Sequence, residues 1–350
     1  MRSLTKRPFG ALPDGQTVDW IDLANGDTEI SILTYGGIIA SWRAPNTRGD
    51  VADVVIGFDT LDGWLNDPQY FGAVVGRYAN RIRDGRFPLE GHVIDVTSNQ
   101  GNNQLHGGAV GFDKAVWVAE GHASGSDIGV SLRHVSPDGD EGYPGTLTVT
   151  VTYTLNEAGT LRMDFTAHTD APTVVNLTNH VYWNLAGKGD ILDHIAQIEA
   201  GSFLEVGTGT LPTGTIRSVE NTAFDFRQPR RIGNRIAESD EQLALGGGYD
   251  HCYVIDGTPG LLRPCARVTA DGRVLEIETT QPGVQFYSGN GIRSRTGRDS
   301  QAYGPHSALC LETQHFPDAP NIPQFPSTRL DLGDTYAEST TMSVRPAPGL

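Results

Sequence analysis

Alternation of apolar and polar residues is the strongest signal along the chain, and it is typical of β-strands. In LTVTVTYTL, residues 147–155, every second residue is apolar and the residues between them are threonines. A period of two places one side of a strand in a core and the other in solvent, and threonine is itself favoured in strands. The residues NEAG, 156–159, separate this run from a second one, TLRMDFTAHTD, 160–170. The pattern predicts a hairpin here.

Asp-Gly pairs mark two more places where the chain is expected to turn between strands. Asp84-Gly85 separates NRIR from RFPLEGHVIDV, and Asp271-Gly272 separates CARVTA from RVLEIETT. Asp-Gly between alternating runs favours a tight hairpin, because both residues tolerate a left-handed backbone. Strand-like runs also occupy residues 29–45 and 53–58.

Helical patterns are sparse by comparison. The best candidate is RRIGNRIAESDEQLA, residues 230–244, which is short and weakly periodic. The 43 glycines and 20 prolines indicate many turns, as expected for many short strands. We therefore expect an all-β fold, a large antiparallel β-sandwich with few short helices, that forms a single domain over residues 1–350.

Charge and cysteine content narrow the possible partners and locations. The formal net charge is -16, so we expect no nucleic-acid partner, because phosphate contacts need clustered Lys and Arg. The three cysteines, Cys252, Cys265 and Cys310, have neither a disulfide framework nor zinc-ligand spacing. The N-terminus has no apolar signal-peptide core, and no apolar run reaches membrane-spanning length. We expect a cytoplasmic protein with free thiols and no membrane contact.

Five stretches are rich in polar and aromatic residues where strand sequences are usually monotonous. They are GRYANRI (76–82), NQLHGG (103–108), NLTNHVYWNL (176–185), GGYDHCYVI (247–255) and LETQHFPDAPN (311–321). Their candidate functional residues are Asn80, Arg81, His106, Asn179, His180, Asp250, His251, Glu312 and His315. Each also has a structural interpretation, such as a turn aspartate, a loop histidine or a surface ion pair.

Two of these residues stand out chemically. His180 lies among asparagines and next to aromatic residues, which together offer hydrogen bonds and a stacking surface of the kind that a sugar needs. The alternative is a core histidine with a satisfied hydrogen bond. Glu312 follows the apolar run ALCL, so we expect it near the end of a buried strand. A carboxylate there must be paired, hydrogen-bonded or shifted in pKa, and a raised pKa suits a general base.

Motifs for other kinds of chemistry are missing. The sequence has no His-Glu-x-x-His zinc motif, no Gly-x-Ser-x-Gly nucleophile motif and no Gly-x-x-x-x-Gly-Lys phosphate loop. The remaining histidines, carboxylates, amides and arginines suit acid–base chemistry on a polyol. We therefore expect no cofactor and no metal.

Taken together and in order, these motifs resemble those of the aldose 1-epimerase (galactose mutarotase) family. The resemblance rests on GRYANRI, NQLHGG, NLTNHVYWNL, YDH, QPGVQFYSGN and LETQHFPDAPN, and it extends from about Tyr35 to the C-terminus. It implies a β-supersandwich that interconverts the α and β anomers of free aldoses such as glucose, galactose or a pentose. It also implies roles for seven residues: Glu312 as general base, His180 as general acid, His106 as a second histidine near the anomeric region, and Asn80, Arg81, Asp250 and Gln285 as hydroxyl ligands. Gln281 competes with Gln285 for its role.

This chemistry makes a demand on His180. A histidine works as an acid only if its pKa stays near or above neutrality, and we expect Glu312 or Asp250 to hold it there. The monosaccharide is the expected partner, with the chain a monomer or homodimer.

Three alternatives remain open from the sequence. Strand alternation would point Arg77, Arg81 and Arg83 to one face, which would suit a hexose-6-phosphate 1-epimerase. A non-catalytic carbohydrate-binding protein would need the aromatics and amides alone. A glycoside hydrolase would need two carboxylates about 5–9.5 Å apart, with Glu312 and Asp250 as the candidates.

Overall fold

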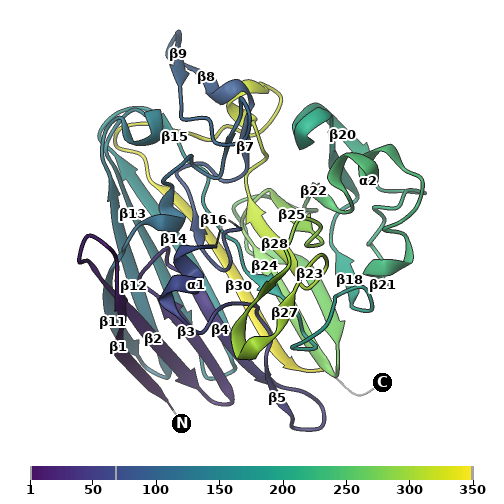
Figure 1. The fold of residues 1–350 in the computed structure, drawn as a ribbon. Helices are drawn as coiled ribbons and strands as arrows, with labels where there is room; N and C mark the ends of the chain where they lie inside the picture. The colour runs from purple at the N-terminus through teal and green to yellow at the C-terminus, as the bar shows by residue number, and fades with distance from the viewer. Residues whose placement is uncertain (1, 68, 348–350) are drawn as a thin grey trace.

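The computed structural model describes residues 2–67 and 69–347, and antiparallel strands form most of the regular structure there. The five-stranded sheet runs in chain order: β1 (Ser3–Ala11), β2 (Thr17–Asn25), β3 (Thr28–Leu33), β4 (Ile39–Pro45) and β5 (Val51–Asp53). The nine-stranded sheet has the order β11 (Val118–Ser124), β12 (Asp127–Ser136), β13 (Leu147–Leu155), β14 (Thr160–Thr169), β30 (Tyr336–Pro346), β24 (Arg273–Thr279), β23 (Arg263–Ala270), β18 (Ile195–Ile198) and β21 (Arg230–Arg231). Figure 1 shows both.

A six-stranded sheet completes the large layers. Its order is β17 (Tyr182–Trp183), β28 (Leu309–Gln314), β25 (Gly283–Tyr287), β22 (Asp250–Val254), β19 (Ser202–Val206) and β20 (Pro212–Ser218). Five two-stranded pairs join loops to these sheets: β6 (Val74–Val75) with β16 (Thr178–Asn179), β7 (Arg81–Ile82) with β10 (Gln104–Leu105), β8 (Arg86–Leu89) with β9 (His92–Asp95), β15 (Thr173–Val174) with β29 (Arg329–Leu330), and β26 (Arg295–Thr296) with β27 (Ala302–Tyr303). The helices of the described residues are α1 (Leu61–Leu65) and α2 (Glu241–Gly246). The expected all-β fold is confirmed.

Two predicted hairpins are present with the expected boundaries. Strands β13 and β14 pair along their whole length on either side of residues 156–159. Strands β23 and β24 pair up to Ala270 and Arg273, so Asp271-Gly272 is the two-residue turn between them. The left-handed backbone at both turn residues explains the Asp-Gly pair, because other residues are strained there.

The Asp84-Gly85 hairpin prediction was wrong. The pair does form a turn with a left-handed backbone, but β7 before it pairs with β10, and β8 after it pairs with β9 across Glu90-Gly91. The run 53–58 was also only partly a strand, since β5 ends at Asp53 and Val55 makes a single bridge to Trp183.

The predicted helix over residues 230–244 is real only near its end. Asp240 caps the start of α2, accepting hydrogen bonds from the backbone N–H groups of Gln242 (2.8 Å) and Leu243 (3.3 Å). Gly247, with φ +66°, ends the helix in a left-handed conformation. Residues 230–231 pair instead with β18 as strand β21.

One hydrophobic cluster joins the three large sheets. It contains Ile30 of β3, Val151 of β13 and Phe286 of β25, all buried. Because side chains alternate along a strand, the six-stranded sheet has two distinct faces. Val284, Phe286 and Leu311 face this core, which leaves the intervening residues on the opposite face of the sheet. That second face holds the candidate site.

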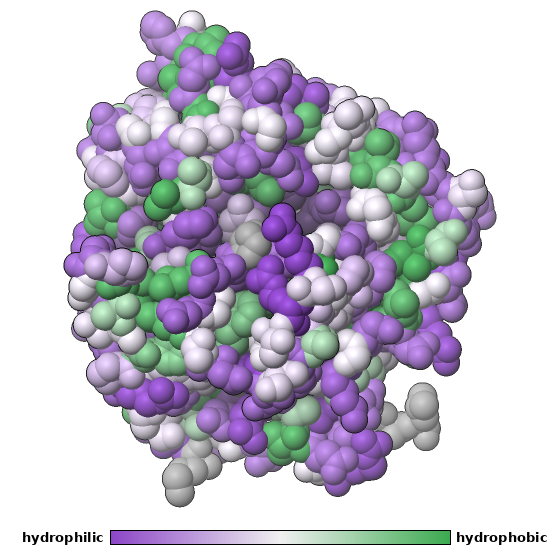
Figure 2. Space-filling view, viewed as in Figure 1, coloured by the Kyte–Doolittle hydropathy of each residue, from purple (hydrophilic) through white to green (hydrophobic). Residues whose placement is uncertain are grey.

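The molecular surface, seen from the same side as in Figure 1, is mostly hydrophilic and is hollowed near its centre (Figure 2). Its apolar residues lie in scattered patches. In the described part of the chain, no helix is both long enough and apolar enough to cross a membrane.

Candidate active site

A pocket of about 230 Å³ lies on the second face of the six-stranded sheet. Its lining residues are Gln69, Tyr70, Asn80, Arg81, Gln100, Leu105, His106, His180, Tyr182, Asp250, Gln285, Tyr287 and Glu312. All seven residues predicted from the sequence are among them. They come from segments up to 232 positions apart (Asn80 to Glu312), so only the folded chain brings them together.

Three neighbouring strands supply the acidic and amide groups of the pocket. Gln285 of β25 stands directly opposite Glu312 of β28, and Asp250 lies on the adjacent strand β22. The Gln285 amide donates a 2.6 Å hydrogen bond to Oδ1 of Asp250. Gln281, the competing candidate, donates instead to the Leu177 carbonyl and the Tyr336 hydroxyl, outside the pocket. The geometry therefore places Gln285, and not Gln281, where it can contact a ligand.

Two hydrogen bonds join His106 and Asn80, one to the His106 ring and one between their backbones. The Asn80 N–H donates to Nδ1 of His106 at 3.1 Å, and the His106 N–H donates to the Asn80 carbonyl at 3.0 Å. Both residues have a left-handed backbone, with φ +64° and +53°. Because Nδ1 accepts a hydrogen bond, the proton of the neutral ring resides on Nε2. Burial and nearby positive groups lower the pKa of His106 well below its usual value. His106 is thus a neutral hydrogen-bond donor.

This tautomer bears on metal binding. Ligand atoms of His106, His180 and Glu312 lie within 4.8 Å of one another, a set that could surround a metal ion. A metal-bound imidazole nitrogen must be free of its proton, however, and the protonated Nε2 of His106 is not. The donor set therefore fits a polar organic ligand better than a metal ion.

His180 is held between two tyrosine rings. It stacks on Tyr182, with ring centroids 4.9 Å apart and an interplanar angle of 5°, and more loosely on Tyr70, at 6.0 Å and 12°. Its Nε2 lies 3.6 Å from Oε2 of Glu312. Burial lowers the pKa of His180 to about 3. The expectation that a carboxylate keeps this pKa near neutrality was wrong, because the loss of hydration on burial disfavours the charged ring.

The pKa of Glu312 is shifted in the opposite direction, upward. Burial and then the charge of Asp250 raise its pKa well above the usual range, while Arg81 opposes the shift. An uncompensated charge on a buried group is costly, so both shifts favour neutral groups. Burial therefore favours the arrangement of the His180–Glu312 pair in which the imidazole is neutral and the carboxyl group of Glu312 holds the proton.

Arg81 supplies positive charge to the pocket but is already engaged. Its guanidinium lies 3.8 Å from Oδ2 of Asp250, and its Nε donates to Gln100 at 2.8 Å. Asn80 supports it, because Oδ1 of Asn80 accepts hydrogen bonds from the Arg81 backbone N–H at 3.0 Å and from Nη1 at 3.4 Å.

The predicted alignment of three arginines was wrong. Arg77 is buried and donates to the carbonyls of Pro144 and Gly145 and to the Ser136 hydroxyl. Arg83 pairs with Asp318 at 3.2 Å. Strand β7 spans only Arg81–Ile82, and the left-handed Asn80 breaks the alternation that the prediction assumed. Among the described residues, Arg81 is the only arginine that lines the pocket.

Comparisons with known proteins identify the family of the chain. A family model described as aldose 1-epimerase matches residues 19–343. The chain belongs to the aldose 1-epimerase family. It is 44% identical to galactose mutarotase from Bos taurus over 346 residues, covering 97% of this chain and 98% of that one. It is 35% identical to aldose 1-epimerase from Escherichia coli K12, covering 94% and 95%. The resemblance drawn from the motifs is confirmed, and the chain is an isomerase acting on carbohydrates.

Solved structures support the same fold. An aldose epimerase homologue from C. elegans matches with a TM-score of 0.86 and 31% identity, covering 94% of this chain and 99% of that one. Galactose 1-epimerase from Lactobacillus acidophilus NCFM matches with a TM-score of 0.89 over 99% and 100% of the two chains, at 24% identity, which supports the fold alone.

Some residues from the family-like motifs lie outside the pocket. His251 packs edge-on against the rings of Phe203 and Phe224, and its Nδ1 accepts from the Asp250 N–H at 3.2 Å. Asn179 donates to the Gly72 carbonyl at 2.9 Å. His315, just after β28, pairs with Glu338 at 3.3 Å. For these three the structural interpretation fits.

Other pocket residues were missed by the sequence reasoning. Tyr70 lies in no recognisable motif, and nothing in the local sequence indicates its left-handed backbone, with φ +61°. Tyr287 is part of QPGVQFYSGN and Tyr182 of NLTNHVYWNL, so both could have been assigned from their positions beside Gln285 and His180.

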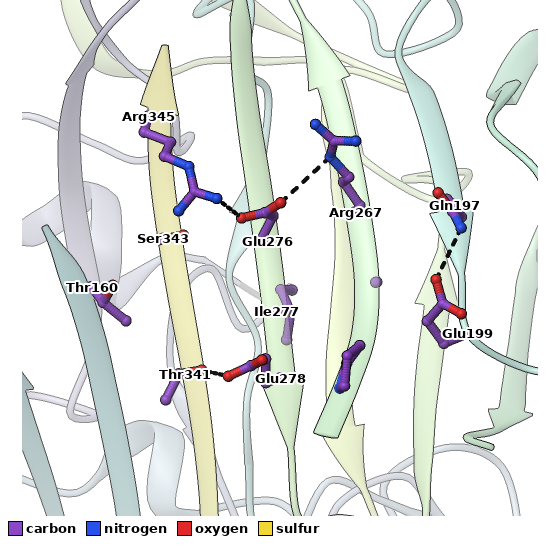
Figure 3. Close-up of a pocket in the computed structure, with 12 residues that line it drawn as sticks. Thr160, Gln197, Glu199, Arg267, Glu276, Ile277, Glu278, Thr341, Ser343 and Arg345 are labelled. Atoms are coloured by element: carbon purple, nitrogen blue, oxygen red, sulfur yellow. Dashed lines mark hydrogen bonds and ion pairs between the residues drawn. The ribbon is translucent and has the colours of Figure 1, made fainter. Parts of the chain in front are cut away.

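A second hollow, of about 450 Å³, lies over the outer face of the nine-stranded sheet (Figure 3). Its polar side chains already contact one another: Glu276 pairs with Arg345 and Arg267, and Glu278 accepts from Thr341. These side chains are partly exposed to solvent, and no histidine lines the hollow among the described residues. The smaller pocket is the one equipped for the family's acid–base chemistry.

Proposed function

We propose that this chain interconverts the α and β anomers of a free aldose, such as galactose, glucose or a pentose, with His180 and Glu312 as the proton-transfer pair. The observation that carries the proposal is their position 3.6 Å apart, both buried, in one sugar-sized pocket. Within the described protein, Oε2 of Glu312 and Oε1 of Gln285 have no hydrogen-bond partner. Buried polar atoms normally have partners, and sugar hydroxyls would supply them here.

The reaction needs one proton removed and one proton delivered. Glu312, as a carboxylate, takes the proton from the anomeric hydroxyl, and His180, as an imidazolium, gives its proton to the ring oxygen. The bond between the anomeric carbon and the ring oxygen breaks, and an aldehyde forms. Rotation about the C1–C2 bond presents the other face of the aldehyde. Reclosure reverses both proton transfers and restores the pair. Each positioned transfer typically contributes about 10²–10⁴ in rate.

The pKa shifts give this cycle a further feature. In the working arrangement Glu312 is a carboxylate and His180 an imidazolium. In the alternative arrangement Glu312 is a carboxylic acid and His180 a neutral imidazole. Both arrangements hold one proton on the pair. Ring opening converts the first into the second. Burial lowers the pKa of His180 and raises that of Glu312, so the protein environment favours the arrangement that accompanies the open-chain sugar. This preference assists ring opening, while Arg81 favours the carboxylate needed at the start.

The remaining pocket residues hold the sugar. We assign Asn80, Arg81, Asp250 and Gln285 to hydroxyl groups, since their amides, guanidinium and carboxylate converge on the pocket. His106, with its proton on Nε2, donates a hydrogen bond to the ring or anomeric oxygen. The tyrosine rings offer flat faces to the sugar's C–H groups.

Polarimetry tests the proposal directly. Crystalline α-D-galactose is dissolved with and without the protein, and its optical rotation is followed to equilibrium. We expect faster relaxation to the same final rotation, because a catalyst leaves the equilibrium unchanged. If the protein accelerated mutarotation of none of galactose, glucose, xylose and arabinose, the proposal would be wrong.

A further inference from the structure

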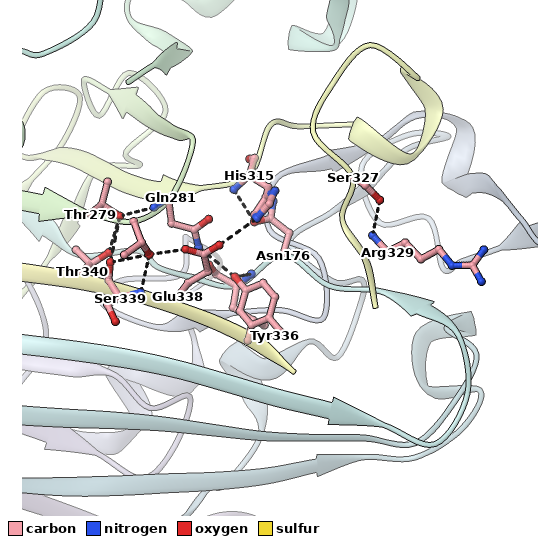
Figure 4. Close-up of polar contacts among 12 residues, drawn as sticks. Asn176, Thr279, Gln281, His315, Ser327, Arg329, Tyr336, Glu338, Ser339 and Thr340 are labelled. Atoms are coloured by element: carbon pink, nitrogen blue, oxygen red, sulfur yellow. Dashed lines mark hydrogen bonds and ion pairs between the residues drawn. The ribbon is translucent and has the colours of Figure 1, made fainter. Parts of the chain in front are cut away.

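Asn176 lies outside the pocket but joins the segments that form it. Its side chain is fully buried. The Nδ2 group donates to the carbonyl oxygens of Ala79, at 3.1 Å, and His315, at 3.3 Å, and Oδ1 accepts from the His315 N–H at 2.9 Å. Figure 4 shows Asn176 beside His315, the residue that follows strand β28.

The backbone of Asn176 strengthens one of these links. Its N–H donates to the Arg77 carbonyl at 3.1 Å, and its carbonyl accepts from the Ala79 N–H at 2.8 Å. The residue therefore binds the 77–79 segment through both backbone and side chain. That segment leads directly into Asn80 and Arg81.

The partners of Asn176 all lie close in sequence to pocket residues. Ala79 precedes Asn80, His315 follows Glu312 by three positions, and Asn176 itself precedes His180 by four. We propose that Asn176 is a positioning residue that sets the separation between the sugar-holding pair Asn80–Arg81 and the proton-transfer residue Glu312. This inference rests on the proposed function of that pocket.

An amide is well suited to this position because it must donate and accept at once. Two carbonyls and one N–H meet its side chain, so removing the amide leaves three backbone groups without that partner in the interior. The His315 side chain is held separately, by Glu338 at 3.3 Å (Figure 4). The amide of Asn176 is therefore a side-chain link between the end of β28 and the segment before Asn80, and the Tyr78 hydroxyl, which donates to the Phe316 carbonyl at 3.3 Å, is another.

Asn184 provides a matched control from the same motif. It is also buried, and its Nδ2 donates to the carbonyls of Lys188 and Gly189, both at 3.2 Å, and Ser307, at 2.9 Å. None of these partners is among the described residues that line the pocket. Truncating Asn184 should thus cost stability without moving the catalytic groups.

The experiment compares Asn176→Ala, Asn176→Ser and Asn184→Ala with the unaltered chain. Circular dichroism and thermal unfolding establish the folded fraction, and polarimetry with galactose gives kcat and KM per folded molecule. For Asn176→Ala we expect kcat to fall roughly 10–100-fold with a smaller change in KM, because a displacement of about 1 Å can cost 10²-fold. The sugar can follow the residues that hold it, but it then loses alignment with Glu312. Asn176→Ser, which retains a donor, should show a smaller loss.

Asn184→Ala should lower the unfolding temperature but keep kcat and KM within roughly threefold, the scale of effects remote from the reacting atoms. The inference is overturned if folded Asn176→Ala retains kcat within that range, or if Asn184→Ala loses as much. If Asn176→Ala does not fold, the same criterion applies to Asn176→Ser. If neither folds while Asn184→Ala does, Asn176 serves stability and the inference also fails. Lack of catalysis by the unaltered chain would instead contradict the proposed function.

Discussion

Oε2 of Glu312 lies 3.6 Å from Nε2 of His180, and both side chains are buried in the same pocket. Glu312 is part of strand β28, whereas His180 lies in the short segment between β16 and β17. Burial shifts their pKa values in opposite directions, which favours a neutral imidazole on His180 and a protonated carboxyl group on Glu312. The predictions below follow from this relationship and from the groups around it.

The first prediction concerns the pH dependence of catalysis. The pair loses its single-proton state on the acid side only when His180 and Glu312 are both protonated. Because burial lowers the pKa of His180 to about 3, kcat/KM should stay level as the pH falls through about 6.5, the ordinary value for histidine. The enzymatic rate, corrected for spontaneous mutarotation, is measured by polarimetry between neutrality and the onset of acid unfolding. An acid limb centred near that ordinary value would show that the free enzyme works with a normally titrating histidine.

The second prediction concerns stability in acid. Burial lowers the pKa of His251 to about 3, below the value of about 6.5 expected in the unfolded chain. The unfolded state therefore binds more protons between these values, and the free energy of unfolding falls as the pH drops below about 6.5. At pH 5 the loss from this one residue is on the order of 2 kcal/mol relative to pH 7.

Urea unfolding at pH 7 and pH 5 measures this loss. In His251→Gln the difference between the two pH values should shrink by about that amount. The exposed His92→Gln serves as the control, because its ring is in solvent in both states and should leave the difference unchanged. An unfolding free energy that rose toward pH 5 would contradict the burial argument.

The third prediction concerns Asp250, which Gln285 holds at 2.6 Å and Arg81 approaches at 3.8 Å. Asp250→Asn removes a charged hydrogen-bond acceptor for a sugar hydroxyl, so kcat/KM for galactose should fall roughly 10–100-fold. Asp256→Asn, at an exposed position just beyond β22, is the matched control and should change little. Equal activity of the two variants would remove Asp250 from the sugar-binding set.

The fourth prediction distinguishes free sugars from sugar phosphates. Arg77 and Arg83 are bound elsewhere, and Arg81 already approaches Asp250. The described pocket thus has no arginine free of an acidic partner for a phosphate. We expect kcat/KM for glucose 6-phosphate to be no higher than for glucose, and inorganic phosphate not to compete with glucose. A clear preference for the phosphorylated sugar would reverse this conclusion.

Much of the fold could be predicted because local patterns carry it. The strand at residues 147–155 is visible from its threonine alternation, and the Asp271-Gly272 turn from the conformations that its residues tolerate. The order of the large sheets is set by pairing between distant segments, which no local pattern records. The Asp84-Gly85 turn illustrates this, since the same local signal joins strands that pair with different partners.

The site was predicted to the extent that chemistry is visible in the residue types. Glu312 and His180 are conspicuous as titratable residues in apolar or aromatic surroundings. The sequence could not choose between Gln281 and Gln285, because the choice depends on Gln285 standing opposite Glu312 in the sheet. It also misjudged the pKa of His180, because the depth of burial that lowers this pKa comes from the surrounding segments.

The most direct test of the account is the mutarotation rate of α-D-galactose with Glu312→Gln, compared with Glu278→Gln. Gln keeps the shape of Glu312 but cannot take up the anomeric proton, whereas Glu278 lies on the outer face of the nine-stranded sheet (Figure 3). The account predicts that Glu312→Gln folds, binds galactose and loses about 10²–10⁴ in kcat, while Glu278→Gln keeps the unaltered rate. A folded Glu312→Gln protein that accelerates mutarotation as well as the unaltered chain would contradict the account.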